Sequence, residues 1–110
     1  MIHRPRRVTQ PTLDVLAALL SSKSKVWGLE LVRQTGLKTG TVYPILARLE
    51  TFGWIRSSWE VDQKHKGPRR RLWELTQEGE VRATELIASK IQNGHSLKGF
   101  RLEPISPRVI

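Results

Sequence analysis

The sequence predicts a mainly α-helical domain with one small β-hairpin. Apolar residues recur at helical spacing in four segments of the chain. Two short runs, at about residues 54–61 and 71–75, instead alternate apolar and polar side chains, as half-buried strands do. Gly67-Pro68, between the two runs, is a turn signal. The length of 110 residues suits a single domain.

Composition excludes several classes of protein. The chain has no cysteine, which excludes a disulfide framework, a cysteine-ligated zinc or iron–sulfur site and a cysteine nucleophile. Its longest apolar run, residues 15–20, is far shorter than the roughly 20 residues that a membrane-spanning helix needs. No signal-peptide pattern opens the chain. We therefore expect a soluble, cytoplasmic protein.

The positive charge is concentrated in two short segments. The chain carries 19 Lys and Arg against 10 Asp and Glu, a net charge of +9. Residues 1–10 hold three basic and no acidic side chains, and residues 61–71 hold five basic side chains and one acidic. Clustering of this kind is typical of phosphate contacts, although an arm and a loop that are merely solvated would also carry charge.

The first half of the chain predicts an arm and two helices. Residues 1–8 lack periodicity and indicate a flexible basic arm. A helix from about Pro11 to Leu20 follows, since proline suits a first helical turn. This helix is apolar on two faces, and each face should pack against something. We expect one face to pack in the domain's own core and the other against a partner subunit. A second helix is expected over Trp27–Thr35, closed by Gly36.

A third helix is expected up to Phe52, beginning at Thr39 or Thr41. Proline inside a helix removes a hydrogen bond and clashes with the carbonyl four residues earlier. We therefore favour a start with Thr41 as N-cap, which puts Pro44 in the first turn. An apolar stripe at i, i+3, i+4 and i+7 faces the core in this helix: Val42, Ile45, Leu46 and Leu49.

The second half of the chain predicts a hairpin and a fourth helix. A strand is expected over Trp54–Val61 with Ile55, Trp59 and Val61 on its buried face, and a returning strand over Arg71–Leu75. Thr76 should cap the fourth helix, which Asn93-Gly94 ends. Heptad-like spacing in that helix involves Val81, Thr84, Ala88 and Ile91.

This order of elements is that of a helix-turn-helix, followed by a β-hairpin with a cationic loop, which we call the basic wing, and by a C-terminal helix that we expect to mediate dimerisation. We divide the chain into an arm (1–8), a DNA-binding domain (9–76), the dimerisation helix (77–93) and a tail (94–110). A helix of this kind fits the major groove, where it presents side chains to base edges, and the wing would reach the backbone or the minor groove.

Three motifs resemble the PadR family of transcriptional regulators. They read G-T-V-Y-P-I-L-A-R-L-E at residues 40–50, G-W-I at 53–55 and G-P-R-R-R-L-W-E-L-T at 67–76. The resemblance covers about residues 12–92; it departs at Trp73, where the family usually has Tyr, and it matches the short form without a separate C-terminal domain. It implies a winged helix-turn-helix fold with a three-helix core, a basic wing and a C-terminal dimerisation helix. It also implies a homodimeric repressor on an inverted-repeat operator, with repression often relieved by a small-molecule effector.

Two groups of residues are candidates for contacts with partners. The DNA candidates lie at the start of the third helix and on the wing, and the resemblance implies that a tyrosine hydroxyl among them binds phosphate; they are Lys38, Thr39, Thr41, Tyr43, Arg48, Lys64, Lys66, Arg69 and Arg70. The dimer candidates come from the first and fourth helices: Leu13, Val15, Leu19, Thr84, Ile87, Ala88 and Ile91.

No pattern predicts catalysis, a metal or a cofactor. His3, His65 and His95 lie far apart without ligand spacing, and no acid–base or nucleophile constellation is evident. The alternative to a DNA-binding regulator is a winged-helix module that binds a protein partner and no specific DNA.

Overall fold

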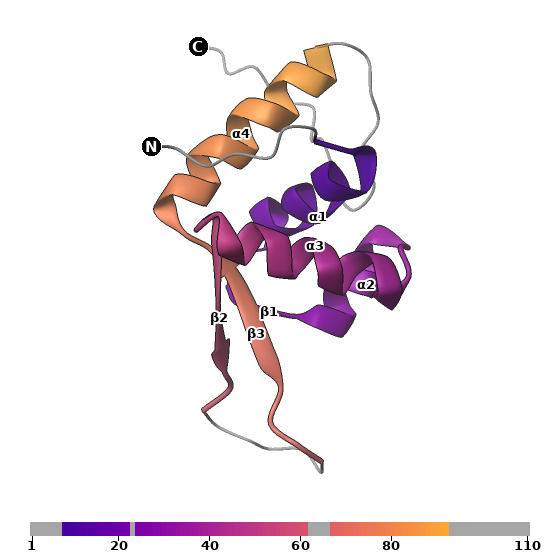
Figure 1. The fold of residues 1–110 in the computed structure, drawn as a ribbon, viewed down its shortest axis with the longest axis vertical. Helices are drawn as coiled ribbons and strands as arrows, with labels where there is room; N and C mark the ends of the chain where they lie inside the picture. Colours follow the sequence, from indigo (N-terminus) through magenta and orange to yellow (C-terminus); the bar gives the residue numbers. More distant parts are fainter. Residues whose placement is uncertain (1–7, 23, 62–66, 93–110) are drawn as a thin grey trace.

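The computed structural model describes residues 8–22, 24–61 and 67–92. Most of the predicted arm, the tip of the wing at 62–66 and the tail lie outside the described residues. Within the described residues seven elements follow one another (Figure 1): α1 (Gln10–Ser21), β1 (Val26–Trp27), α2 (Gly28–Thr35), α3 (Thr39–Thr51), β2 (Ile55–Trp59), β3 (Arg71–Leu75) and α4 (Gln77–Gln92). The fold is the predicted winged helix-turn-helix.

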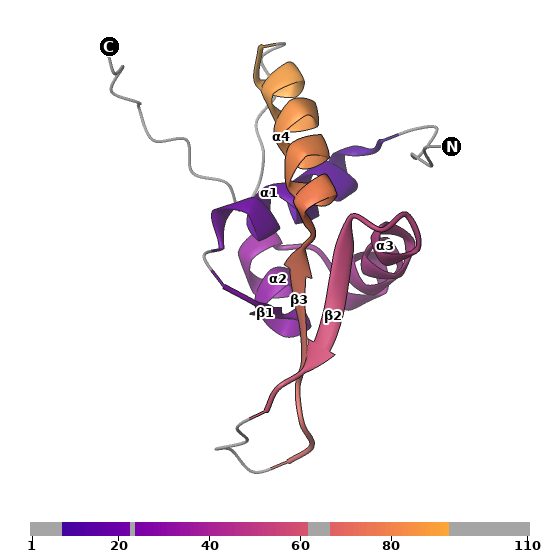
Figure 2. The same cartoon turned by 90° about the vertical axis from the view of Figure 1, so that its left-hand side faces the viewer.

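The three strands form one antiparallel sheet with β3 in the middle, in the order β1-β3-β2 (Figure 2). On one side of β3 the register pairs Ile55 with Leu75 and Trp59 with Arg71. On the other side Val26 pairs with Trp73. Strand β1 was not predicted from the sequence, because a strand of two residues is too short to show any alternation.

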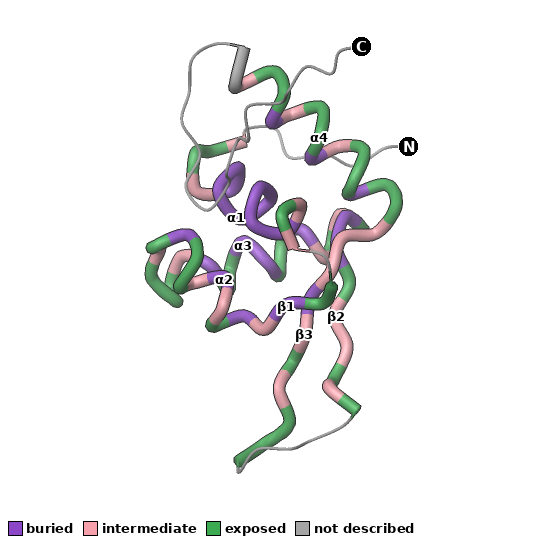
Figure 3. The backbone as a smooth tube through the Cα atoms, turned by 180° about the vertical axis from the view of Figure 1, so that it is seen from behind, coloured by how far each residue is buried: buried purple, intermediate pink, exposed green. Residues whose placement is uncertain are grey.

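Helix α1 is the centre of the core. Thr9 caps it by accepting a hydrogen bond from the Thr12 amide at 3.4 Å. The helix packs against α2, α3 and α4, and every residue from 12 to 19 is buried (Figure 3). The inference that α1 needs a partner subunit as a second cover was therefore wrong, because the chain itself covers both apolar faces.

Helix α3 begins earlier than we expected. Lys38, not Thr41, is its N-cap residue, and Pro44 lies inside the helix. The Lys38 carbonyl accepts from the amides of Thr41 at 2.9 Å and Val42 at 3.0 Å. Pro44 has no amide hydrogen to donate to the carbonyl of Gly40, four residues earlier. Both residues are exposed. Water can satisfy that carbonyl, which lowers the cost of a proline at this position.

The hairpin of β2 and β3 extends beyond the helical core. Ile55, where β2 leaves α3, is buried, but Trp59 is 57% exposed and Val61 is 90% exposed. The alternating pattern predicted all three on a buried face, and this was wrong for Trp59 and Val61. The face that they share with Ile55 continues past the edge of the helices, so no helix of the described residues covers it there (Figure 1).

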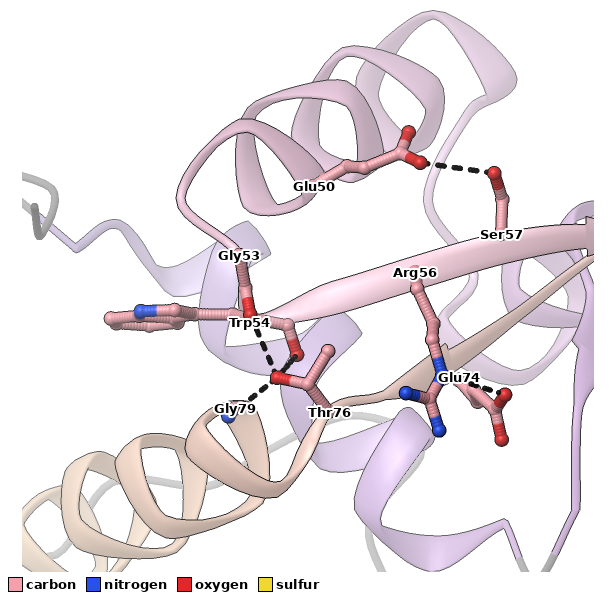
Figure 4. Close-up of polar contacts among 8 residues, drawn as sticks. All are labelled: Glu50, Gly53, Trp54, Arg56, Ser57, Glu74, Thr76 and Gly79. Carbon is pink, nitrogen blue, oxygen red and sulfur yellow. Dashed lines mark hydrogen bonds and ion pairs between the residues drawn. The ribbon is translucent and has the colours of Figure 1, made fainter.

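Thr76 joins the sheet to α4. Its hydroxyl donates to the Gly53 carbonyl at 2.7 Å and accepts from the Gly79 amide at 3.0 Å (Figure 4). The Thr76 amide donates to the Trp54 carbonyl at 2.9 Å. Gly79 is buried against the same carbonyl, so closely that a Cβ at position 79 would overlap its oxygen. The predicted cap is confirmed, and it also fixes where α4 leaves the domain.

Candidate nucleic-acid interface

Helix α3 has one buried and one exposed face. The predicted apolar stripe is buried in the core. The exposed residues recur three and four positions apart, so they form a continuous face along the helix; they are Gly40, Tyr43, Pro44, Ala47, Arg48 and Thr51. Two of the DNA candidates, Tyr43 and Arg48, therefore share this face.

The turn before α3 presents its first residues to solvent. Gly36 ends α2 with φ 74°, a left-handed conformation that glycine adopts without strain, and its amide donates to the Val32 carbonyl at 2.9 Å. Lys38 and Thr39 are exposed and Thr41 is half-buried. The first amides of a helix have no acceptor within the helix, so this end of α3 offers N–H donors beside the Lys38 ammonium.

Tyr43 packs on the start of α2. A Cβ on Gly28 would lie 2.8 Å from the Cζ atom of the tyrosine ring, so only glycine fits there without displacing the ring. Tyr43 is 39% exposed. The ring thus has a packing role and an exposed surface, and the phosphate contact that the resemblance implies for its hydroxyl stays a prediction.

Only part of the basic wing lies among the described residues. Lys64 and Lys66 fall outside them. Arg69 is exposed and Arg70 is half-buried. The guanidinium carbon of Arg70 lies 3.9 Å from the centroid of the Trp27 ring. Arg71 begins β3, as the sequence suggested, and its side chain points to aromatic and acidic neighbours.

The contacts of Arg70 and Arg71 were not visible in the sequence. Arg71 donates to Ser57 Oγ at 2.9 Å and lies 3.6 Å from a Glu50 carboxylate oxygen, while Ser57 donates to Glu50 at 3.0 Å (Figure 4 shows the last pair). Trp27 comes close to Arg70 because β1 pairs with β3. Without β1, no sequence signal links the two residues.

Helix α4 presents a separate surface. Val81, Thr84 and Ala88 are exposed, and their spacing places them on one side of the helix. Ile87 is buried against the core, and Leu13, Val15 and Leu19 are buried in α1. These four dimer candidates therefore have almost no surface to offer a partner. Nothing is described of the Ile91 side chain.

Other kinds of site find no support in the described part of the chain. Its residues contain no group of three or more His, Asp or Glu that could hold a metal ion. The three histidines lie outside it. No helix within residues 8–22, 24–61 and 67–92 is long and apolar enough to cross a membrane.

Comparison with known proteins identifies the family. The model of the transcriptional regulator PadR-like family matches residues 15–85, more than half of the chain. No curated protein matches the sequence. The solved structure of smu.1704 from Streptococcus mutans is similar, with 25% identity and a TM-score of 0.63 over 83% of this chain and 87% of that one. A PadR family transcription regulator from Clostridium difficile has 28% identity and a TM-score of 0.53 over 74% of this chain and 95% of its own. A PadR family transcriptional regulator from Eggerthella lenta has 25% identity and a TM-score of 0.58 over 73% of this chain and 75% of its own.

The similarities cover the winged helix and the motifs at 40–50, 53–55 and 67–76 together. The chain belongs to the PadR-like family of transcriptional regulators.

Proposed function

We propose that the protein is a sequence-specific DNA-binding repressor that acts in the cytoplasm as a homodimer on an inverted-repeat operator. The observation that carries this proposal is the exposed face of α3. It adjoins the root of the basic wing, because Glu50 of α3 contacts both wing strands through Ser57 and Arg71.

The α3 face supplies the elements of groove recognition. Its N-terminal turn carries Lys38, Thr39 and Thr41, which combine a cation and hydroxyl groups with helix amides. Tyr43 and Arg48 follow on the same face. Gly40 and Ala47 carry almost no side chain, so the helix backbone can approach base edges closely at these two positions.

The wing supplies positive charge beside α3. We propose that Lys64 and Lys66 at its tip, with Arg69, contact the phosphate backbone or the minor groove. Helix α4 has the opposite character, since Glu78, Glu80 and Glu85 are all exposed on it. DNA is therefore expected on the side of α3 and the wing, and α4 is left for the partner subunit.

The dimer would form through the exposed stripe of α4. Val81 is 51% exposed, and Thr84 and Ala88 beside it on the same side of the helix are exposed as well, so the stripe has surface that a partner helix can cover. Val81, Thr84 and Ala88 lie at heptad-like spacing, and a second copy of the helix would bury all three. This stripe replaces the predicted contribution of α1. Ile91, the next position of the pattern, stays a prediction, as does the existence of an effector.

Selection of bound fragments from a random duplex library tests the DNA proposal. We expect an enriched motif with two inverted half-sites about 34 Å apart, one helical turn. Changing Lys38 or Arg48 to Ala should weaken binding to that motif by about tenfold. Lys90→Ala in the last turn of α4 is the matched control and should leave affinity unchanged.

Two results would contradict the proposal. Binding without any enriched sequence would leave only a non-specific polyanion binder. A monomer in gel filtration that does not shift duplex DNA would favour the alternative of a protein-interaction module.

The dimer surface has its own test by sedimentation. Val81→Glu and Ala88→Glu should each give a folded monomer, because a carboxylate would be buried in the subunit interface. Ser89→Glu is the control, since Ser89 is exposed on a different side of α4. A dimer that survives both stripe variants would exclude this surface.

A further inference from the structure

The three successive arginines at the root of the wing do not share one environment. Side chains alternate between the two faces of a strand. The ladder of β2 and β3 continues one residue beyond Arg71, because the Glu60 amide donates to the Arg70 carbonyl at 2.9 Å. Arg70 and Arg71 therefore leave the hairpin on opposite faces, one toward β1 and α2 and the other toward α3.

Arg70 is fixed against the start of α2. Its guanidinium lies over the Trp27 ring at 3.9 Å, within the range of a cation–π contact. Its own amide donates to the Glu60 carboxylate at 3.0 Å. Trp27 is both the last residue of β1 and the N-cap residue of α2. The stack therefore ties the hairpin to the helix-turn-helix.

Arg71 is fixed against α3. The Glu50 carboxylate at 3.6 Å neutralises its charge, and the Ser57 hydroxyl accepts one of its hydrogen bonds at 2.9 Å. Its guanidinium also lies 4.9 Å from the centroid of the Trp73 ring. A cation that stays paired with a carboxylate does not neutralise a phosphate, so it displaces no counterion from the DNA.

We propose that Arg70 and Arg71 are positioning residues that hold the root of the wing between α2 and α3, and that Arg69 is the phosphate contact of the run. This inference rests on the proposed DNA-binding function. It revises the expectation from the sequence, which counted Arg70 among the DNA contacts. The contact of Arg70 with Trp27 and that of Arg71 with Glu50 would together set the distance between the wing and α3. That distance decides which part of the duplex the wing reaches.

Salt dependence separates the two roles. A lost phosphate contact lowers the slope of log affinity against log salt by about 0.9, whereas a lost positioning contact changes affinity and not slope. We would measure binding of the full-length protein to random-sequence duplex DNA by fluorescence anisotropy over a series of KCl concentrations. In Arg69→Gln the slope of log affinity against log salt should fall by about 0.9. Arg70→Gln and Arg71→Gln should keep the wild-type slope and weaken binding about two- to fivefold.

A double-mutant cycle tests the stack itself. Trp27→Leu removes the ring and no charge, so it should reproduce the loss of Arg70→Gln, and the double variant should lose no more than either single one. Trp27→Phe keeps an aromatic face and should restore part of the affinity. Thermal unfolding followed by circular dichroism confirms that each variant is folded.

Two outcomes would overturn the positioning roles. A slope that falls by about 0.9 in Arg70→Gln or Arg71→Gln would make that residue a phosphate contact. Additive losses from Trp27→Leu and Arg70→Gln would show that the two side chains act separately. Failure of the proposed function is a different result: the wild-type protein would show no binding to duplex DNA at any salt concentration, or the library selection would enrich no sequence.

Discussion

Replacing Gly79 with alanine should destabilise the fold, because the added methyl group meets backbone. A Cβ at position 79 would overlap the Trp54 carbonyl oxygen and lie 2.6 Å from the carbonyl carbon. A flexible side chain could rotate away, but this carbonyl also accepts the hydrogen bond from the Thr76 amide at 2.9 Å. The clash can be relieved only if α4 moves away from the start of β2.

Three contributions set the size of the effect. Overpacking of a tight contact costs about 1–3 kcal/mol. Movement of α4 weakens the 3.0 Å cap between the Gly79 amide and the Thr76 hydroxyl, which is worth about 1 kcal/mol. Alanine regains about 1 kcal/mol of helix propensity over glycine. The free energy of unfolding should therefore fall by about 1–3 kcal/mol.

Urea unfolding followed by circular dichroism measures this change. All variants are compared at one protomer concentration, because the stability of a dimer depends on it. Gly40→Ala is the matched control, since Gly40 also lies in the first turn of a helix but has open space around its Cβ position. It should gain up to about 1 kcal/mol. A Gly79→Ala protein that unfolds with the wild-type midpoint, or gains stability as Gly40→Ala does, would refute the steric argument.

Substitutions at three further positions can be compared in the same unfolding experiment. Gly36→Ala should cost about 1 kcal/mol, because an alanine at φ 74° is strained; an unchanged midpoint would mean that the turn relaxes. Thr76→Val should cost about 1–2 kcal/mol through the lost cap and the lost hydrogen bond to Gly53, whereas Thr76→Ser should retain most of the stability. Arg56→Ala should change stability by less than about 0.5 kcal/mol, since its 3.0 Å ion pair with Glu74 is exposed; a larger loss would reveal a packing role for the Arg56 stem.

The elements with local signals could be predicted from the sequence. The stripe of α3, the glycine that ends α2 and the Thr76 cap each depend on residues within one or two helical turns, and the structure confirms all three. The predicted start of α3 was wrong because the rule against a proline inside a helix does not distinguish an exposed face from a buried one. An exposed proline costs less, since water reaches the carbonyl that it leaves unpaired.

The features that the sequence did not predict depend on tertiary geometry. Alternation in β2 gives the face on which Trp59 lies but not where the helices that cover that face end. Two apolar faces on α1 indicate two covers but not that α4 of the same chain provides one of them. The environment of Arg70 required β1, whose two residues carry no pattern. Each of these three features involves a neighbour that is distant in the sequence.

The tryptophans differ in how far they are buried, which makes the protein its own optical reporter. Trp54 and Trp73 are buried, and their indole N–H groups have no hydrogen-bond partner among the described residues, so their emission should lie at short wavelength. Trp59 on the wing is mostly exposed and should emit at longer wavelength. A soluble quencher would therefore act first on Trp59. Its shielding when DNA is added would follow the wing directly, without any attached dye.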